Sequence, residues 1–183
     1  NGFALASWMA RVPDVKDLLQ LTPGQLSVLL LSISVGALVG LPAAGRISSR
    51  IGAKNTVRLA LVILVPGLVL AAAAVTYGHS MYLAIPGLFL LGLGNGIWDV
   101  AQNLEGTLVE RGVNRAIMPW FHAAFSGGTV VGALVGAGIV ALRVPIFAHM
   151  AVVAVGVTAL AFVATGPFLS ASGTSSEPHD ADG

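Results

Sequence analysis

Four polar residues recur at helical spacing within an otherwise apolar stretch of the chain. Positions i, i+4, i+7 and i+8 of this stretch hold Asn95, Asp99, Gln102 and Asn103. At about 3.6 residues per turn these side chains share one helix face. A carboxylate on such a face can gain and lose a proton, and amides can bind a polar solute. We expect Asp99 to be the proton-coupling residue and the three amides to contact solute; a structural polar cluster is the alternative.

A second stretch carries a similar polar face. His122, Ser126 and Thr129 lie at i, i+4 and i+7. We expect His122 to lie level with Asp99 on an antiparallel neighbouring helix, where it pairs with the carboxylate or contacts solute. A histidine bonded to a helix carbonyl is the equal alternative. His122 and Ser126 therefore join the candidate cavity residues, whereas His149 stands alone among apolar residues and is expected to be structural.

The composition shows which elements must position these residues. Hydrophobic residues make up 56% of the chain and charged residues 9%, which is typical of a membrane protein. Long apolar runs of about 20 residues predict membrane-crossing helices. Strands are excluded because barrel strands alternate in polarity and are about 10 residues long. The predicted spans are 25–45, 59–77, 81 to about 103, 117–142 and 144–169.

The ends of the chain complete the predicted organisation. Residues 1–10 are apolar but too short to span, so we expect the last part of a truncated first helix. Residues 13–19 predict a short amphipathic helix that Pro13 opens, and Thr22-Pro23 predicts the start of the next span. The expected fold is an all-α membrane bundle over residues 1–169. Residues 170–183 are rich in Ser, Gly, Asp and Pro and predict a disordered cytoplasmic linker.

Basic residues predict the orientation of the bundle. Segments 45–58 and 105–115 carry most of them, and cytoplasmic loops are enriched in Lys and Arg. The two segments hold Arg46, Arg50, Lys54, Arg58, Arg111 and Arg115, against Arg11, Lys16 and Arg143 in the segments expected outside. We therefore expect a multi-pass protein with cytoplasmic basic loops, in a bacterial plasma (inner) membrane.

Several classes of function find no support in the residues. The chain has no cysteine, so it offers no disulfide, thiolate metal site or thiol nucleophile. No metal-ligand spacing, phosphate loop or nucleophile with a base is present. A net charge of +1 gives no reason to expect a nucleic-acid partner. We expect neither an enzyme nor a bound metal or cofactor.

Glycines recur every four residues on two of the spans. This spacing lets helix backbones approach closely in lipid. We expect these positions to pack helices together. They are Gly36 and Gly40 on one span and Gly128, Gly132 and Gly136 on the other.

The basic segment also carries a recognisable spacing. Gly45, Arg50, Gly52 and Lys54 resemble the loop between the second and third helices of the major facilitator superfamily. Ser49 replaces that pattern's Asp, and Ala53 replaces one of its basic residues. The resemblance implies the N-terminal six-helix half of a transporter that works by alternating access with a C-terminal six-helix half. It also implies that the four residues form a gating loop.

Residues 99–103 add a narrower resemblance. Asp-Val-Ala-Gln-Asn is similar to the fourth helix of fucose-permease-like facilitators. By that resemblance Asp99 is the proton-coupling carboxylate and Asn103 a cavity residue, while Met9 stands where that branch can carry an acid. The expected function is secondary active transport of a small polar solute, coupled to protons. Alternatives are a drug or metabolite exporter on the same fold, or a non-transporting membrane module or fragment.

Overall fold

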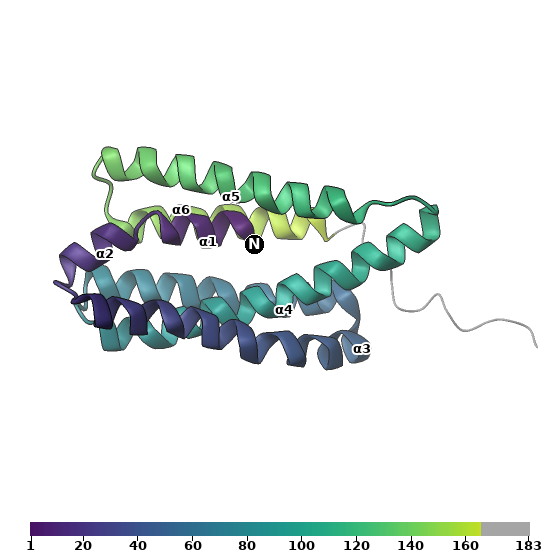
Figure 1. Ribbon diagram of the computed structural model, residues 1–183, viewed down its shortest axis with the longest axis horizontal. Helices are drawn as coiled ribbons and strands as arrows, with labels where there is room; N and C mark the ends of the chain where they lie inside the picture. Colours follow the sequence, from purple (N-terminus) through teal and green to yellow (C-terminus); the bar gives the residue numbers. More distant parts are fainter. Residues whose placement is uncertain (166–183) are drawn as a thin grey trace, which may run out of the picture.

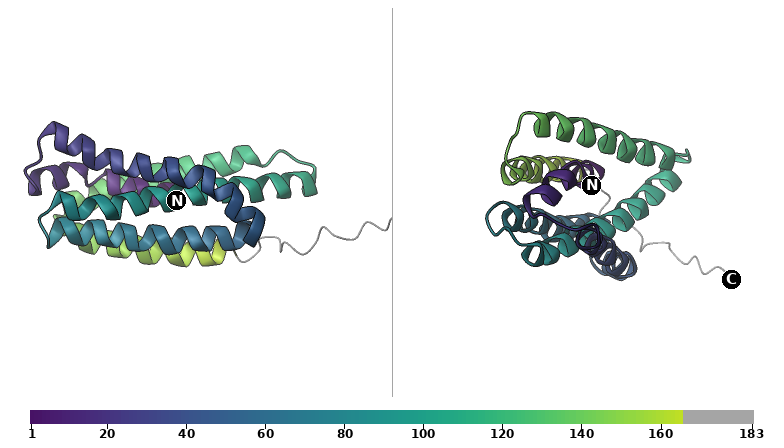
Figure 2. Two further views of the ribbon diagram at one scale, coloured as in Figure 1. Left: turned by 90° about the horizontal axis from the view of Figure 1, so that it is seen from below. Right: turned by 60° about the vertical axis from the view of Figure 1, so that its left-hand side comes forward.

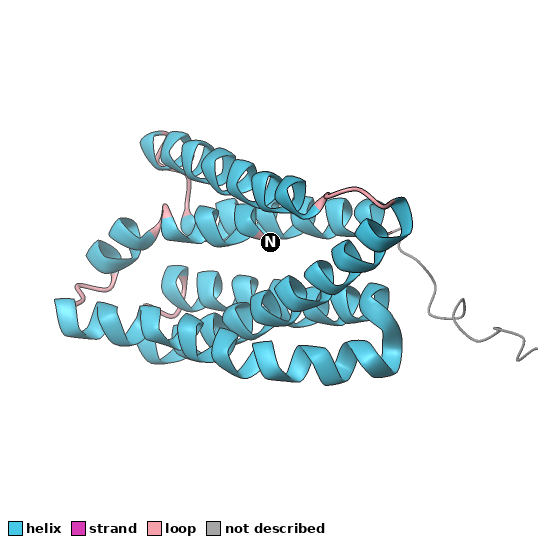
Figure 3. Cartoon of the chain, turned by 45° about the vertical axis from the view of Figure 1, so that its right-hand side comes forward, coloured by secondary structure: helices cyan, strands magenta, loops and turns pink. Residues whose placement is uncertain are grey.

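The described part of the protein is a bundle of helices that run along one common direction. The computed structural model describes residues 1–165, and that part contains no strand (Figures 1 and 3). The helices are α1 (Gly2–Met9), α2 (Val12–Leu18), α3 (Pro23–Thr76), α4 (Met81–Val113), α5 (Met118–Ala141) and α6 (Ile146–Ala164). The predicted linker 170–183 and the last residues of the sixth span lie outside the described residues.

Helix α3 contains two of the predicted spans. Its 54 residues are broken at Gly52, where φ is 78° and ψ is 160°. There the chain reverses, so that residues 23–51 and 53–76 run as two antiparallel limbs (Figure 2). The prediction of a separate loop over 45–58 was wrong, because helical structure continues on both sides of the single turn. Thr22 forms the predicted cap with Gln25, through a reciprocal capping box.

Helix α4 is longer than the sequence predicted. It continues to Val113, so most of the expected inward loop 105–115 is helical and Glu105 is only 3% exposed. Asn114 ends it in the left-handed conformation. The Glu110 carboxylate then accepts hydrogen bonds from the backbone N–H groups of Ile117 and Met118, at 3.2 and 3.0 Å. This carboxylate stabilises the start of α5, where helix N–H groups lack partners within the helix.

The two basic segments lie at the same end of the bundle. The Gly52 turn and the α4–α5 connection are found together there, opposite α2 and the α5–α6 connection (Figure 1). The predicted short helix after Arg11 is present as α2. The two segments that were predicted to be cytoplasmic therefore lie at one end of the bundle.

Glycines lie where the backbones come closest. A Cβ at Gly40 would be 2.5 Å from the carbonyl oxygen of Leu93, and Gly36 also lies against the α4 backbone. A Cβ at Gly132 would be 2.8 Å from the carbonyl oxygen of Phe3 on α1. Larger side chains at these positions would force the helices apart.

Four described helices, α3 to α6, are long and apolar enough to cross a membrane. At about 1.5 Å per residue, α3 is long enough for two crossings of a core of roughly 30 Å, one in each limb. The fold is thus an all-α membrane bundle in which α4 lies beside both limbs of α3, and α1 lies against α5 and α6.

Candidate functional site

Asp99 lies near the middle of α4 rather than toward one end. The predicted span ended near Asn103, close after Asp99. Because α4 runs from Met81 to Val113, Asp99 has more than three helical turns on either side. The side chain is partly exposed. A carboxylate within a membrane-crossing helix is costly unless it faces the bundle interior or water.

The beginning of α1 lies beside Asp99. Asn1 lies close to the Asp99 carboxylate. The Asn1 side-chain Oδ1 accepts from Gly2 N–H at 2.9 Å, whereas its Nδ2 is buried without a partner among the described residues. Sequence reasoning did not single out Asn1.

The remaining polar residues of α4 differ in their hydrogen-bond partners. Gln102 Oε1 accepts a hydrogen bond from Trp98 Nε1 at 3.0 Å, so this amide is held by its own helix. Asn95 Oδ1 is buried without a partner among residues 1–165. Asn103 is partly exposed, as are Asn95 and Gln102. Among the described residues, the Asn95 amide oxygen and the Asp99 carboxylate therefore accept no hydrogen bond from a side chain. The NH₂ group of Gln102 lies on the same face.

The structure does not pair Asp99 with His122. Within the described part of the chain no ion pair joins them, and both His122 and Ser126 are exposed. The reason is that α1 packs against the middle of α5: a Cβ at Gly2 would lie 2.8 Å from Thr129 Oγ1. Helix α5 meets α4 near Gly106, where Met118 and Phe121 approach. Asp99 thus lies beside Asn1 and forms no ion pair with His122 in the described part of the chain.

The residues of the predicted gating loop lie around the α3 turn. Gly52 forms the turn itself, Gly45 and Arg50 are exposed, and Lys54 is half-buried. Arg58, one helical turn after Lys54, places its guanidinium 5.6 Å from the ring centre of Phe162 on α6. This cation–π contact joins the second limb of α3 to α6.

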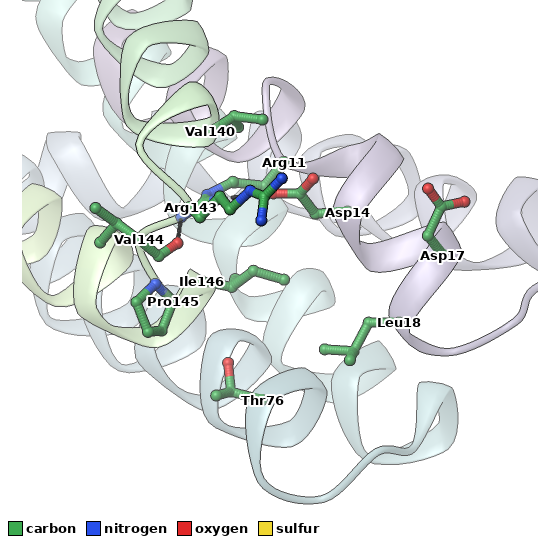
Figure 4. Close-up of a pocket in the computed structure, with 10 residues that line it drawn as sticks. All are labelled: Arg11, Asp14, Asp17, Leu18, Thr76, Val140, Arg143, Val144, Pro145 and Ile146. Atoms are coloured by element: carbon green, nitrogen blue, oxygen red, sulfur yellow. Dashed lines mark hydrogen bonds and ion pairs between the residues drawn. The ribbon is translucent and has the colours of Figure 1, made fainter.

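A buried charged cluster at the opposite end was missed by sequence reasoning. Arg11, predicted in an outward segment, is only 1% exposed. It bonds to Asp14 and to His149 of α6, so His149 is not isolated among apolar side chains. A pocket of about 460 Å³ lies beside it, between α2 and the α5–α6 connection (Figure 4). The Arg11–Asp14 spacing is a local signal, but the partner on α6 is 138 residues away.

The family model of the major facilitator superfamily matches residues 1–180. The chain belongs to this superfamily. It is 37% identical over 169 residues to an uncharacterised transporter of Sinorhizobium fredii. The aligned residues make up 92% of this chain and 43% of that protein. An uncharacterised MFS-type transporter of Yersinia pestis is 34% identical over 183 residues, or 98% of this chain and 45% of its own length.

A further relative, membrane protein MosC of Rhizobium meliloti, is 30% identical over 132 residues, which are 72% of this chain and 31% of that protein. No solved structure matches. The chain spans less than half the length of these curated relatives. The matching family and these relatives indicate a membrane transporter rather than an enzyme. The long apolar helices are typical of an integral membrane protein.

Proposed function

We propose that this chain is the N-terminal six-helix half of a secondary transporter that moves a small polar solute by alternating access, coupled to protons. The family supports transport, and a length below half that of the relatives supports a second half with which this one works. In such transporters the solute site lies at the interface between the repeats, near the bilayer midplane.

The observation that carries the proposal is the position of Asp99. It lies mid-way along α4, partly exposed, and no cationic side chain forms an ion pair with it among residues 1–165. Desolvation disfavours a carboxylate, whereas water or a nearby cation favours it. A group without a fixed cationic partner gains and loses its proton as the cavity changes sides, and so couples proton and solute movement.

The neighbouring polar groups fit a solute with several hydroxyl groups. Asn95 offers an unpaired amide oxygen, and Gln102 offers amide donors because Trp98 already occupies its oxygen. Asn103, partly exposed on the same helix, completes this lining. The exposed α5 residues His122 and Ser126 are proposed as separate solute contacts, apart from Asp99. The similarity of residues 99–103 to fucose-permease-like facilitators makes a neutral polyhydroxylated solute the first class to test.

The basic end of the bundle is proposed to face the cytoplasm of a bacterial inner membrane. Gly45, Arg50, Gly52 and Lys54 lie around the α3 turn, away from the middle of α4. We assign them to the conformational cycle rather than to solute binding. The lipid bilayer and a C-terminal half are the partners that this arrangement requires.

The test replaces Asp99 with Asn in the full-length protein, in liposomes. Asp99→Asn keeps the shape and polarity of the side chain but cannot titrate. Proton-driven accumulation should be abolished, while counterflow of the same solute should persist. The matched control is Asp17→Asn, the same chemical change at an exposed carboxylate on α2, which should leave both unchanged. Uphill accumulation by Asp99→Asn would exclude this residue as the coupling group.

A further inference from the structure

Arg11 connects three segments of the chain at the end of the bundle opposite the α3 turn. Its Nη1 donates to Asp14 Oδ2 of α2 at 2.6 Å, and its Nη2 donates to the backbone carbonyl of Val144 in the α5–α6 connection. Its Nε donates to Nδ1 of His149 on α6 at 3.2 Å. Arginine has five N–H donors in a planar fork and no acceptor. One buried side chain thereby fixes the α1–α2 junction to α6.

The bond to His149 requires an uncharged imidazole. Nδ1 can accept from Arg11 only when it carries no proton, so the proton of the neutral ring is assigned to Nε2. Nε2 is buried without a partner among the described residues, and the side chain is 2% exposed. A second proton would turn Nδ1 into a donor that faces the Arg11 guanidinium. It would replace an attraction with a repulsion between two cations.

The surroundings of His149 contain few groups that could offset this repulsion. Asp14, with its side chain 34% exposed, is the carboxylate of the cluster, and it is already paired with Arg11. Arg143 of the α5–α6 connection lines the adjacent pocket and adds positive charge (Figure 4). Asp17 of α2 is a second carboxylate on the same pocket, but it is exposed. Among the described residues, α1 has no titratable side chain, and α5 presents Gly136, 3.8 Å from His149 Cε1. Helix α3 meets the start of α6 through the uncharged Thr76, which accepts from Phe147 N–H.

We propose that Arg11, His149 and the Val144 carbonyl form a proton-sensitive latch between the α1–α2 junction and the α5–α6 connection. The latch is closed while His149 is neutral and opens when the ring is protonated. The pocket beside Arg11 and Asp14 gives water a route to the cluster. Acidification at this end of the protein thus loosens α2 independently of the carboxylate in the middle of α4.

The test measures the accessibility of α2 as pH changes. Val15 is 1% exposed, and its N–H bonds to the Arg11 carbonyl at 2.9 Å. Val15→Cys reports opening of the latch through its maleimide reaction rate, measured on detergent-solubilised full-length protein from which every cysteine outside these 183 residues has been replaced. The exposed Lys16→Cys on the same helix provides the reference rate, since thiolate formation affects both cysteines. The ratio of the two rates should rise about tenfold as the pH is lowered from about 8 to about 5, through and below the range in which an exposed histidine changes charge.

His149→Gln separates the latch from general effects of acid. The glutamine oxygen can accept from Arg11 Nε but does not titrate. The rate ratio should therefore stay constant across the same pH range. Ala148→Gln, at the exposed neighbouring position on α6, is the matched control and should keep the acid-dependent rise. A constant ratio with His149 present, or a rise that persists in His149→Gln, would overturn the proposal.

A second variant applies if His149→Gln does not fold. Replacing His79, His122 and His179 by Gln leaves His149 as the single histidine of this chain. An acid-dependent rise in this triple variant supports the latch. Loss of the rise assigns the titration to another histidine and refutes it.

Discussion

Replacement of Gly52 by alanine tests whether the turn in α3 depends on backbone conformation. With φ at 78° and ψ at 160°, the residue occupies a region that is essentially restricted to glycine. Holding a side chain there costs about 1–3 kcal/mol. We therefore expect Gly52→Ala to lower the free energy of unfolding by about that amount, because the turn joins the two limbs of α3.

Gly45 offers a matched control within the same motif. It lies inside a helical limb, and a Cβ built there meets no atom within 4 Å. Alanine is favoured over glycine in a helix interior by roughly 1 kcal/mol. Gly45→Ala should be neutral or stabilising, so the two alanine variants should differ by about 2–4 kcal/mol.

The assay is reversible unfolding of the full-length protein in mixed micelles, followed by far-ultraviolet circular dichroism. Each variant is compared with the unmodified protein at the same detergent composition. Equal destabilisation by Gly45→Ala and Gly52→Ala would refute the backbone argument. An unchanged stability of Gly52→Ala would show that the turn adopts another conformation.

Three further predictions concern topology, gating and packing. Cysteine in place of the exposed Ser49 should react with an impermeant thiol reagent only from the cytoplasm, and Lys16→Cys only from outside; the reverse pattern would invert the orientation. Arg50→Ala should slow transport while equilibrium solute binding stays nearly unchanged, and a parallel loss of binding would exclude a gating role. Gly132→Leu should destabilise the protein by about 1–3 kcal/mol, because the α1 backbone lies 2.8 Å from the position of its Cβ. Gly138→Leu should not destabilise it, because a Cβ at Gly138 meets no atom within 4 Å. Equal melting temperatures of the two variants would contradict close packing at Gly132.

Properties that depend on near neighbours could be predicted from the sequence. Apolar runs of membrane-crossing length, the Thr22-Pro23 helix start and the short helix after Arg11 follow from local composition and capping chemistry. The helical face of Asn95 and Asp99 follows in the same way from spacing. The C-terminal end of α4 did not, because Glu105 lies in a helix although its charge resembles that of a loop residue.

Contacts between distant segments were decided by the tertiary structure. Asp99 and His122 share a compatible spacing, but α1 packs against the middle of α5 and the two side chains form no ion pair in the described structure. Sequence spacing predicts which face of its own helix a side chain occupies. It does not predict which other helix packs against that face.

The clearest example is Arg11, whose sequence context predicts an exposed loop charge. The fold buries it against His149 and a carbonyl of the α5–α6 connection. The sequence by itself determined that this chain forms apolar membrane-crossing helices, one of which carries a carboxylate. Only the tertiary structure decided which polar groups meet, since a buried charge needs partners that the folded chain brings from far along the sequence.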